Sequence, residues 1–317
     1  MNIGMIILDK IGLELPEFKV SNGKITNFNN NPHFPQNGIG DFLIRDDWNF
    51  LFLGEEGYYF HKGTKINKHL DTIFVVSDRQ FNPIDIKQLR NIYPNTQLFG
   101  YVKEMSPQIH MPEYRIKFLQ SCDKIVIKWR HEVCNLVEQA TNKKVYHLPW
   151  AYNIDKIREL FFKPWQEREN KILSWVNERR GLNNQADNYT FAHLLGQKFN
   201  YEVVFKDLNI ESLLRDWLEL LSQFKFIVNV DAGFGGGQVP IESAILEVIP
   251  LGGLTDSAVC LWPQFAIIDK SRLEFEFYFL AHDPGLQEKT RKEAFERLVN
   301  RHSFGIVKTK LEQILND

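Results

Sequence analysis

The chain has 317 residues, of which 44% are hydrophobic and 25% charged, the ordinary composition of a soluble globular protein. This length exceeds what one ordinary core organises and suits two domains of roughly 150 residues each. The net charge of −2 gives no overall positive field, which weighs against a protein whose only task is to hold nucleic acid.

The first half of the chain repeats a strand followed by a helix. Residues 15–61 are less regular, with candidate strands only at 43–44 and 50–53. Elsewhere, apolar runs and periodicity predict strands at residues 1–8, 72–76, 97–102, 124–127 and 144–148, and helices at residues 83–92, 114–120 and 131–141.

The second half restarts this alternation after a polar, proline-containing crossing at residues 150–170. Strands are expected at residues 171–176, 201–205, 226–230 and 265–268, and helices at residues 189–199, 210–222, 287–299 and 307–315. Alternating strands and helices are typical of parallel sheets that are buried on both faces. We therefore predict an α/β fold with two Rossmann-like domains, residues 1–153 and 154–317, that face each other across a cleft.

The first apolar run, residues 1–8, is too short for a signal peptide or a membrane span, and no later run reaches about 18 apolar residues. The three cysteines, at positions 122, 134 and 260, are odd in number and have no metal-ligand spacing. They fit a reducing compartment, with each thiol packed as a small hydrophobe. We expect a cytoplasmic protein without a transmembrane segment, and a peripheral membrane contact stays open.

A glycine loop lies between the strand at 226–230 and an apolar helix that ends near Pro250. Its glycines Gly235, Gly236 and Gly237 let the backbone approach a ligand closely, and the helix that follows offers unpaired N–H groups to an anion. The loop has neither the G-x-G-x-x-G spacing nor a Gly-Lys-Ser/Thr sequence. A flexible hairpin or a strand bulge is the plain alternative to a phosphate site.

Charged residues stand close to this loop in the predicted sheet. Glu242, early in the helix, can accept hydrogen bonds from two hydroxyls, or it can serve only as an acid favoured by the helix dipole. Arg179 and Arg180 follow one strand and Lys206 ends the next, so these cations can bind a diphosphate or can be solvated loop residues. Their presence at neighbouring strand ends favours a ligand site.

Residues 235–251 resemble the donor domain of GT-B fold glycosyltransferases of the group-1-like superfamily. That family shows a glycine loop, a glutamate followed by a small residue, and a helix that ends before a proline and an apolar strand. The resemblance implies that Glu242 holds the ribose of a nucleotide and that the glycine loop faces its diphosphate and sugar. It also implies a phosphate contact from Arg179 or Arg180, and a donor-sugar contact from Asp231.

The resemblance implies transfer of a sugar from a nucleotide-diphosphate sugar, as co-substrate, to a glycan, lipid, protein or nucleic acid. No separate cofactor is expected. The sequence has no H-E-x-x-H motif and no Asp-x-Asp at a strand end, so no catalytic metal is expected either. Asp78, which ends the strand at 72–76, is the candidate base of an inverting enzyme, with a helix cap as its alternative. Two other functions stay open, namely a GT-B-like protein that binds without turnover and a nucleotide-sugar epimerase.

Two further features have plain explanations. Trp150, Trp165 and Trp262 lie near the crossing and can stack on a sugar, although core packing is the commoner role of tryptophan. The basic stretch from residue 288 to residue 310 fits a solvated helix face, or alternatively a patch for an anionic acceptor such as phospholipid or DNA.

Overall fold

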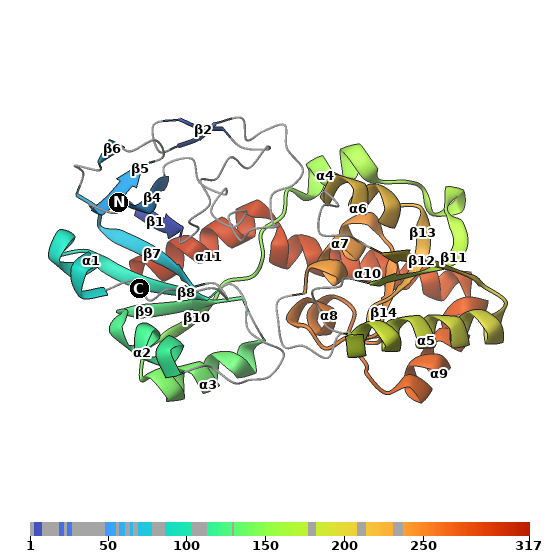
Figure 1. Cartoon of the computed structure of the whole chain (residues 1–317). Helices are drawn as coiled ribbons and strands as arrows, with labels where there is room; N and C mark the ends of the chain where they lie inside the picture. The colour runs from blue at the N-terminus through green and yellow to red at the C-terminus, as the bar shows by residue number, and fades with distance from the viewer. Residues whose placement is uncertain are drawn as a thin grey trace. The chain divides into compact units, whose positions relative to one another are not determined.

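A computed structural model describes two compact units. Unit 1 comprises Met1–Ala151 and Phe304–Asp317, and unit 2 comprises Tyr152–Ser303 (Figure 1). The described residues are 3–7, 19–21, 24–26, 48–54, 57–60, 64–65, 69–77, 86–102, 113–128, 130–176, 182–207, 214–230 and 237–317.

Unit 1 is built on an eight-stranded sheet with the order β10-β9-β8-β7-β1-β4-β5-β6. The strands from β10 to β4 pair in parallel, and β5 and β6 add an antiparallel edge. The strands are β1 (Ile3–Ile7), β4 (Trp48–Gly54), β5 (Gly57–Phe60), β6 (Thr64–Lys65), β7 (Thr72–Ser77), β8 (Gln97–Val102), β9 (Lys124–Ile127) and β10 (Val145–His147), with a separate hairpin of β2 (Lys19–Ser21) and β3 (Lys24–Thr26).

Four helices accompany this sheet: α1 (Ile86–Ile92), α2 (Glu113–Ser121), α3 (His131–Thr141) and α11 (Phe304–Asn316). The central strand β8 is apolar over almost its full length, as expected for a strand covered on both faces. The chain returns to unit 1 through α11, and the side chain of Asp317 accepts hydrogen bonds from Lys144 and Tyr146 at β10. The sequence-based boundary at residue 153 placed this last helix in the second domain, whereas the structure counts it with unit 1.

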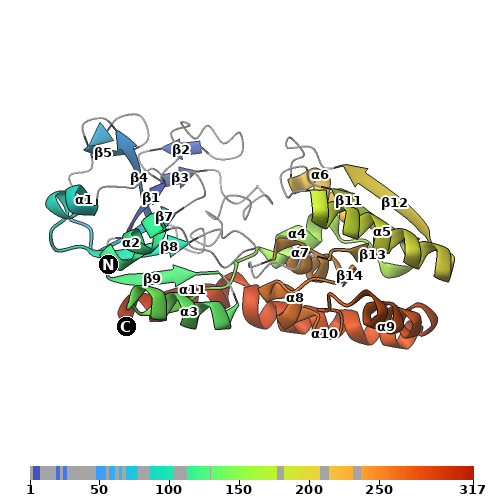
Figure 2. The same ribbon diagram turned by 60° about the horizontal axis from the view of Figure 1, so that its bottom comes forward.

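Unit 2 contains a four-stranded, fully parallel sheet with the order β12-β11-β13-β14. Helices α8, α9 and α10 lie along the same side of this unit (Figure 2). The elements are β11 (Glu169–Val176), β12 (Glu202–Asp207), β13 (Phe224–Val228), β14 (Ile249–Leu251), α4 (Ile154–Phe161), the 3₁₀ helix η3 (Trp165–Glu167), α5 (Leu182–Phe199), α6 (Leu214–Leu221), α7 (Gln238–Leu246), α8 (Asp256–Leu261), α9 (Lys270–His282) and α10 (Pro284–His302).

Local sequence accounts for several helix ends in unit 2. The side chains of Asn153, Thr255, Asp269 and Asp283 cap α4, α8, α9 and α10 by accepting a hydrogen bond from a first-turn N–H. The ends of the unit meet, because the N–H of Tyr152 donates to His302 at 2.9 Å and Tyr152 forms a β-bridge with Ser303.

The strand predicted at residues 265–268 is wrong. Phe265 is fully buried, yet its N–H and that of Ala266 both donate to the carbonyl of Trp262 at the end of α8. The carbonyl of Phe265 accepts from Gly252 instead of from a sheet neighbour. Apolar residues at these positions therefore fill the core from a turn, which satisfies the backbone locally.

Gly100 in β8 tests how closely unit 1 is packed. A methyl group at this position would lie 2.8 Å from Leu119 Cδ2 and 3.2 Å from Cys122 Sγ. We expect Gly100→Ala to lower the free energy of unfolding by about 1–3 kcal/mol through overpacking, as measured by urea denaturation. Gly305 is the control, because it lies in α11 of the same unit with no atom within 4 Å of an added methyl group. Gly305→Ala should leave stability unchanged or slightly raised, and equal losses in both variants would contradict the packing.

Candidate functional site

The carboxyl ends of three parallel strands define the candidate site in unit 2. In the register of β11 and β12, Trp175 lies opposite Lys206, and in that of β11 and β13, Ser174 lies opposite Val228. Lys206 is exposed there. Ligands of open α/β sheets collect at this edge. The backbone beyond β13 is held in place, because the N–H of Val230 donates to Asn188 Oδ1 of α5 at 2.6 Å.

Gly237 begins the helix that follows the glycine loop. Its φ of 74° lies in the left-handed region, which glycine adopts without strain. A methyl group here would lie 2.1 Å from Thr255 Oγ1, so the backbone at Gly237 packs directly on the N-cap residue of α8. The requirement for glycine at this position therefore has a steric cause as well as a conformational one.

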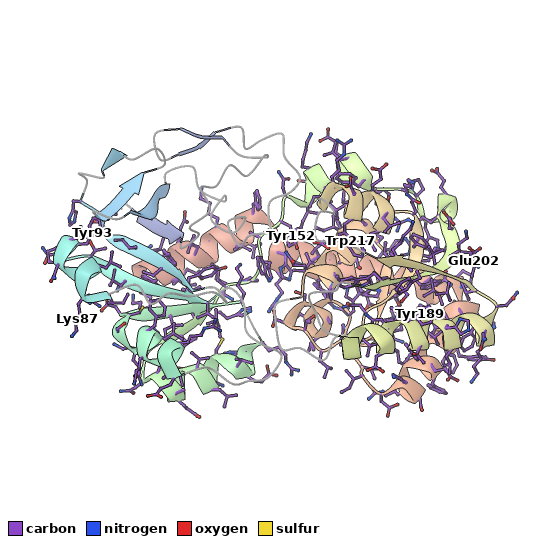
Figure 3. All side chains as sticks on the ribbon, viewed as in Figure 1. Lys87, Tyr93, Tyr152, Tyr189, Glu202 and Trp217 are labelled. Atoms are coloured by element: carbon purple, nitrogen blue, oxygen red, sulfur yellow. The ribbon has the colours of Figure 1, made fainter. Side chains whose placement is uncertain are left out.

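Glu242 is the buried acid of the site. It lies in the middle of α7 and is only 3% exposed. Trp217 Nε1 of α6 donates to its Oε2 at 2.6 Å, and the hydroxyl of Tyr152 donates to its Oε1 at 3.4 Å. Figure 3 labels the side chains of Tyr152 and Trp217 in unit 2. A buried carboxylate is costly unless hydrogen bonds compensate it, and these two donors supply that compensation.

Trp217, one of these two donors, packs against a second tryptophan. Trp175 and Trp217 are both nearly buried, and their ring centroids lie 5.7 Å apart. Burial strongly raises the pKa of the Tyr152 hydroxyl, and the neighbouring carboxylate of Glu242 raises it further. Tyr152 therefore stays protonated over the whole physiological range and remains a donor to Glu242.

The structure places Lys206, Gly237 and Glu242 in one unit: Lys206 at the carboxyl end of β12, and Gly237 and Glu242 at the start and in the middle of α7, which follows β13. The remaining candidates lie outside the described residues: Asp78, Arg179, Arg180, Asp231, Gly235 and Gly236. Their roles remain predictions.

The sequence did not predict the two side chains that donate hydrogen bonds to Glu242. Tyr152 lies 90 residues away and Trp217 lies 25 residues away, and neither belongs to the glycine motif. A signal for Trp217 exists, because it lies on the apolar face of an amphipathic segment, but that signal indicates burial and not a partner.

The three tryptophans near the crossing differ in their surroundings. Trp262 is 2% exposed and donates to the carbonyl of Pro240, so it packs in the core. Trp150 is nearly buried, with the ammonium of Lys128 4.3 Å from its ring centroid. Trp165 is half-buried and lies under the guanidinium of Arg291.

Ion pairs along α10 account for much of the basic stretch. Lys292 pairs with Glu288, and both Lys289 and Arg297 pair with Glu293. These are pairs between residues four apart, as on a solvated helix face. Among the residues that the structure describes, no cluster of three or more histidine, cysteine or acidic side chains could hold a metal ion. None of the helices in the described ranges is both long and apolar enough to cross a membrane.

Several solved structures share the architecture of this chain. An α-glucosyltransferase in complex with UDP and a 13-mer DNA containing an HMU base aligns over 99% of each chain, with a TM-score of 0.58 and 12% identity. The N-terminal domain of Candida albicans trehalose-6-phosphate phosphatase aligns over 79% of this chain and 71% of that one, with a TM-score of 0.62 and 10% identity. Sucrose-phosphate synthase from Thermosynechococcus elongatus aligns over 78% of this chain and 73% of that one, with a TM-score of 0.54 and 14% identity.

No family model and no curated protein matches the sequence. At identities of 10–14% the structural similarity establishes the fold. The chain has the mixed α/β fold, with parallel sheets, of GT-B glycosyltransferase structures. The predicted fold class is confirmed.

The raised pKa of Tyr152 predicts a pH effect. The folded protein holds this proton more tightly than the unfolded chain, in which tyrosine ionises near pH 10. The stabilising contribution is complete below that pH and is lost as the pH rises above it, by up to about 1.4 kcal/mol per pH unit. Urea denaturation between pH 9 and pH 11 should therefore show a flatter decline for Tyr152→Phe than for the wild type. Equal slopes would contradict the assignment, whatever the offset between the proteins at pH 9.

Proposed function

We propose that this protein is a glycosyltransferase that moves a sugar from a nucleotide-diphosphate sugar to an acceptor. One observation carries the proposal: a buried, hydrogen-bonded glutamate follows a glycine loop at the carboxyl edge of a parallel sheet, within a GT-B fold. Unit 2 would bind the donor, and unit 1 would bind the acceptor.

Glu242 would hold the ribose of the donor. Tyr152 donates to one carboxylate oxygen of Glu242 and Trp217 donates to the other. These donors also fix the orientation of the carboxylate, so that it does not reorganise when a diol binds. Ribose hydroxyls would then donate to an acceptor that is already oriented.

The diphosphate would lie between the start of α7 and the cations at neighbouring strand ends. The first N–H groups of a helix point towards an anion at its N-terminus. Gly237 admits a close approach of that anion to the backbone, and Lys206, with Arg179 or Arg180, would balance the charge that develops on the leaving diphosphate. Asp231 would contact the donor sugar, and Gly235 and Gly236 would face the sugar and phosphate.

The residues needed on the acceptor side depend on whether transfer inverts or retains the configuration of the sugar. An inverting transferase needs a base near the attacking hydroxyl, and Asp78 is the proposed one. A retaining transferase needs no such base. In either case the protein would exclude water, because transfer to a sugar hydroxyl competes with hydrolysis. The N-terminus of α7 and the cations at the strand ends together can stabilise the leaving diphosphate. We therefore propose that transfer does not require a metal ion.

Binding of a nucleoside diphosphate tests the donor site directly. Calorimetric titration with UDP, GDP and ADP should show binding of at least one of them. Glu242→Gln should weaken this binding by about tenfold or more, since hydrogen bonds to a charged group contribute about 1.5–3 kcal/mol. Glu296→Gln, an exposed acid on α10, is the matched control and should bind like the wild type. Circular dichroism confirms folding, and unchanged binding in Glu242→Gln would refute the ribose role.

Turnover separates the proposal from its alternatives. Incubation with the donor that binds best should release nucleoside diphosphate when glycan, lipid, protein and DNA acceptors are supplied, and EDTA should not abolish this release. DNA is included because the α-glucosyltransferase that matches over full length was solved with DNA. Neither transfer nor hydrolysis would favour a binding protein, whereas an isomerised donor without an acceptor would favour an epimerase.

A further inference from the structure

Unit 2 contains a group of four cationic side chains that is separate from the proposed donor site. Arg158 belongs to α4, Arg168 directly precedes β11, Lys225 is the second residue of β13 and Arg291 belongs to α10. We call these residues the cation cluster. Arg168 and Lys225 lie at the amino ends of β11 and β13, whereas Lys206 lies at the carboxyl end of β12.

Three members of the cluster surround a single aromatic ring. The guanidinium carbon of Arg291 lies 4.2 Å from the centroid of the Trp165 ring, and that of Arg168 lies 5.7 Å from it. The ammonium of Lys225 is also 5.7 Å from this centroid. Trp165 and Lys225 are both half-buried, so the cluster reaches the protein surface.

One carboxylate forms ion pairs with two members of the cluster. Glu247, which follows α7, accepts from Arg158 Nη2 at 3.0 Å with Oε1 and from Arg291 Nη1 at 2.6 Å with Oε2. Arg168 donates from Nε and Nη2 to the neutral carbonyl of Lys163, at 2.9 Å and 2.5 Å.

No other carboxylate of the described residues pairs with the cluster. Two acids near it in the sequence already have partners, because Glu169 pairs with Lys171 and Glu288 with Lys292. Glu288 lies near enough for Arg291 to help lower its pKa, but its ion-pair partner is Lys292. Four positive charges therefore share Glu247 as their one ion-pair partner among the described residues, and the cluster carries an excess of positive charge.

Two buried donors of the cluster lack an acceptor. Arg168 is 4% exposed, and neither its Nη1 nor Nε of Arg291 has a hydrogen-bond partner among the residues described. Burial lowers the pKa of Arg168 to about 10, and repulsion from Arg291 and Arg158 adds to this lowering although Glu247 opposes it. An unbalanced group of partly buried cations with unused donors is unfavourable unless an anion joins it.

We propose that the cation cluster binds a phosphate-bearing anion at a site separate from the donor site. Guanidinium groups match the tetrahedral oxygens of phosphate with paired N–H donors, and a lysine adds a compact charge that reaches solvent. The half-buried indole of Trp165 provides a flat apolar wall beside the cations. A phosphate dianion would offset most of the excess charge.

Titration with inorganic phosphate and with glucose 6-phosphate tests this site. Calorimetry at low ionic strength should detect binding of at least one probe to the wild type, and Lys225→Gln should weaken it by about tenfold or more. Binding of both probes would show that the phosphate group suffices, and binding of glucose 6-phosphate alone would show that the sugar contributes. Lys292→Gln is the control, because Lys292 is an exposed lysine of the same unit that pairs with Glu288.

Two measurements guard against misfolding and against confusion with the donor site. The probe should raise the thermal midpoint of the wild type and leave that of folded Lys225→Gln nearly unchanged. Glu242→Gln, which weakens the proposed donor site, should retain phosphate binding. No binding of either probe, equal binding in Lys225→Gln, or loss of binding in Glu242→Gln would each overturn the proposal.

Discussion

A carboxylate buried inside an apolar helix is the constraint on which the second unit depends. Every residue of α7 from Val239 to Leu246 is buried, so the carboxylate of Glu242 is largely removed from bulk water and must be compensated by hydrogen-bond donors. Trp217 and Tyr152 supply them, and each therefore ties another part of the chain to α7. Removing either donor would leave a buried charge less compensated, which costs more than an ordinary lost contact.

The far end of the same helix is tied by a second acid. Glu247 has a φ of 58°, in the left-handed region, and so ends α7. Its carboxylate connects Arg158 of α4 with Arg291 of α10, and Arg158 also donates to the carbonyl of Ile245. Acids thus anchor α7 at its middle and at its C-terminal end, and a helix held in this way can present its N-terminus at a fixed place.

Much of the fold could be predicted from the sequence, because buried parallel strands are continuous apolar runs. The strands at β7, β8, β9 and β11 follow the runs that predicted them. Helices α8 and α9 were missed, since α8 is short and the apolar residues of α9 are spread around its circumference. Apolar periodicity identifies a face but not its partner, which is why α11 was assigned to the wrong side of the domain boundary.

The candidate site was predictable only where its residues are neighbours in the sequence. The spacing from the glycine loop to Glu242 is local, so one segment suffices to predict it. The donors to Glu242 and the cations around Trp165 come from distant segments that only the folded chain brings together. Charge balance at such a cluster is a property of three-dimensional packing, and no pattern along the chain reports it.

The meeting of Tyr152 with Ser303 means that unit 2 is an insertion within unit 1. The chain leaves unit 1 after residue 151 and re-enters it only at residue 304. During synthesis, unit 2 is complete before unit 1 receives its last helix, so the order of folding can differ from the order of the sequence. The inserted unit also has adjacent ends, the arrangement in which a domain can be excised or replaced with little strain on its host.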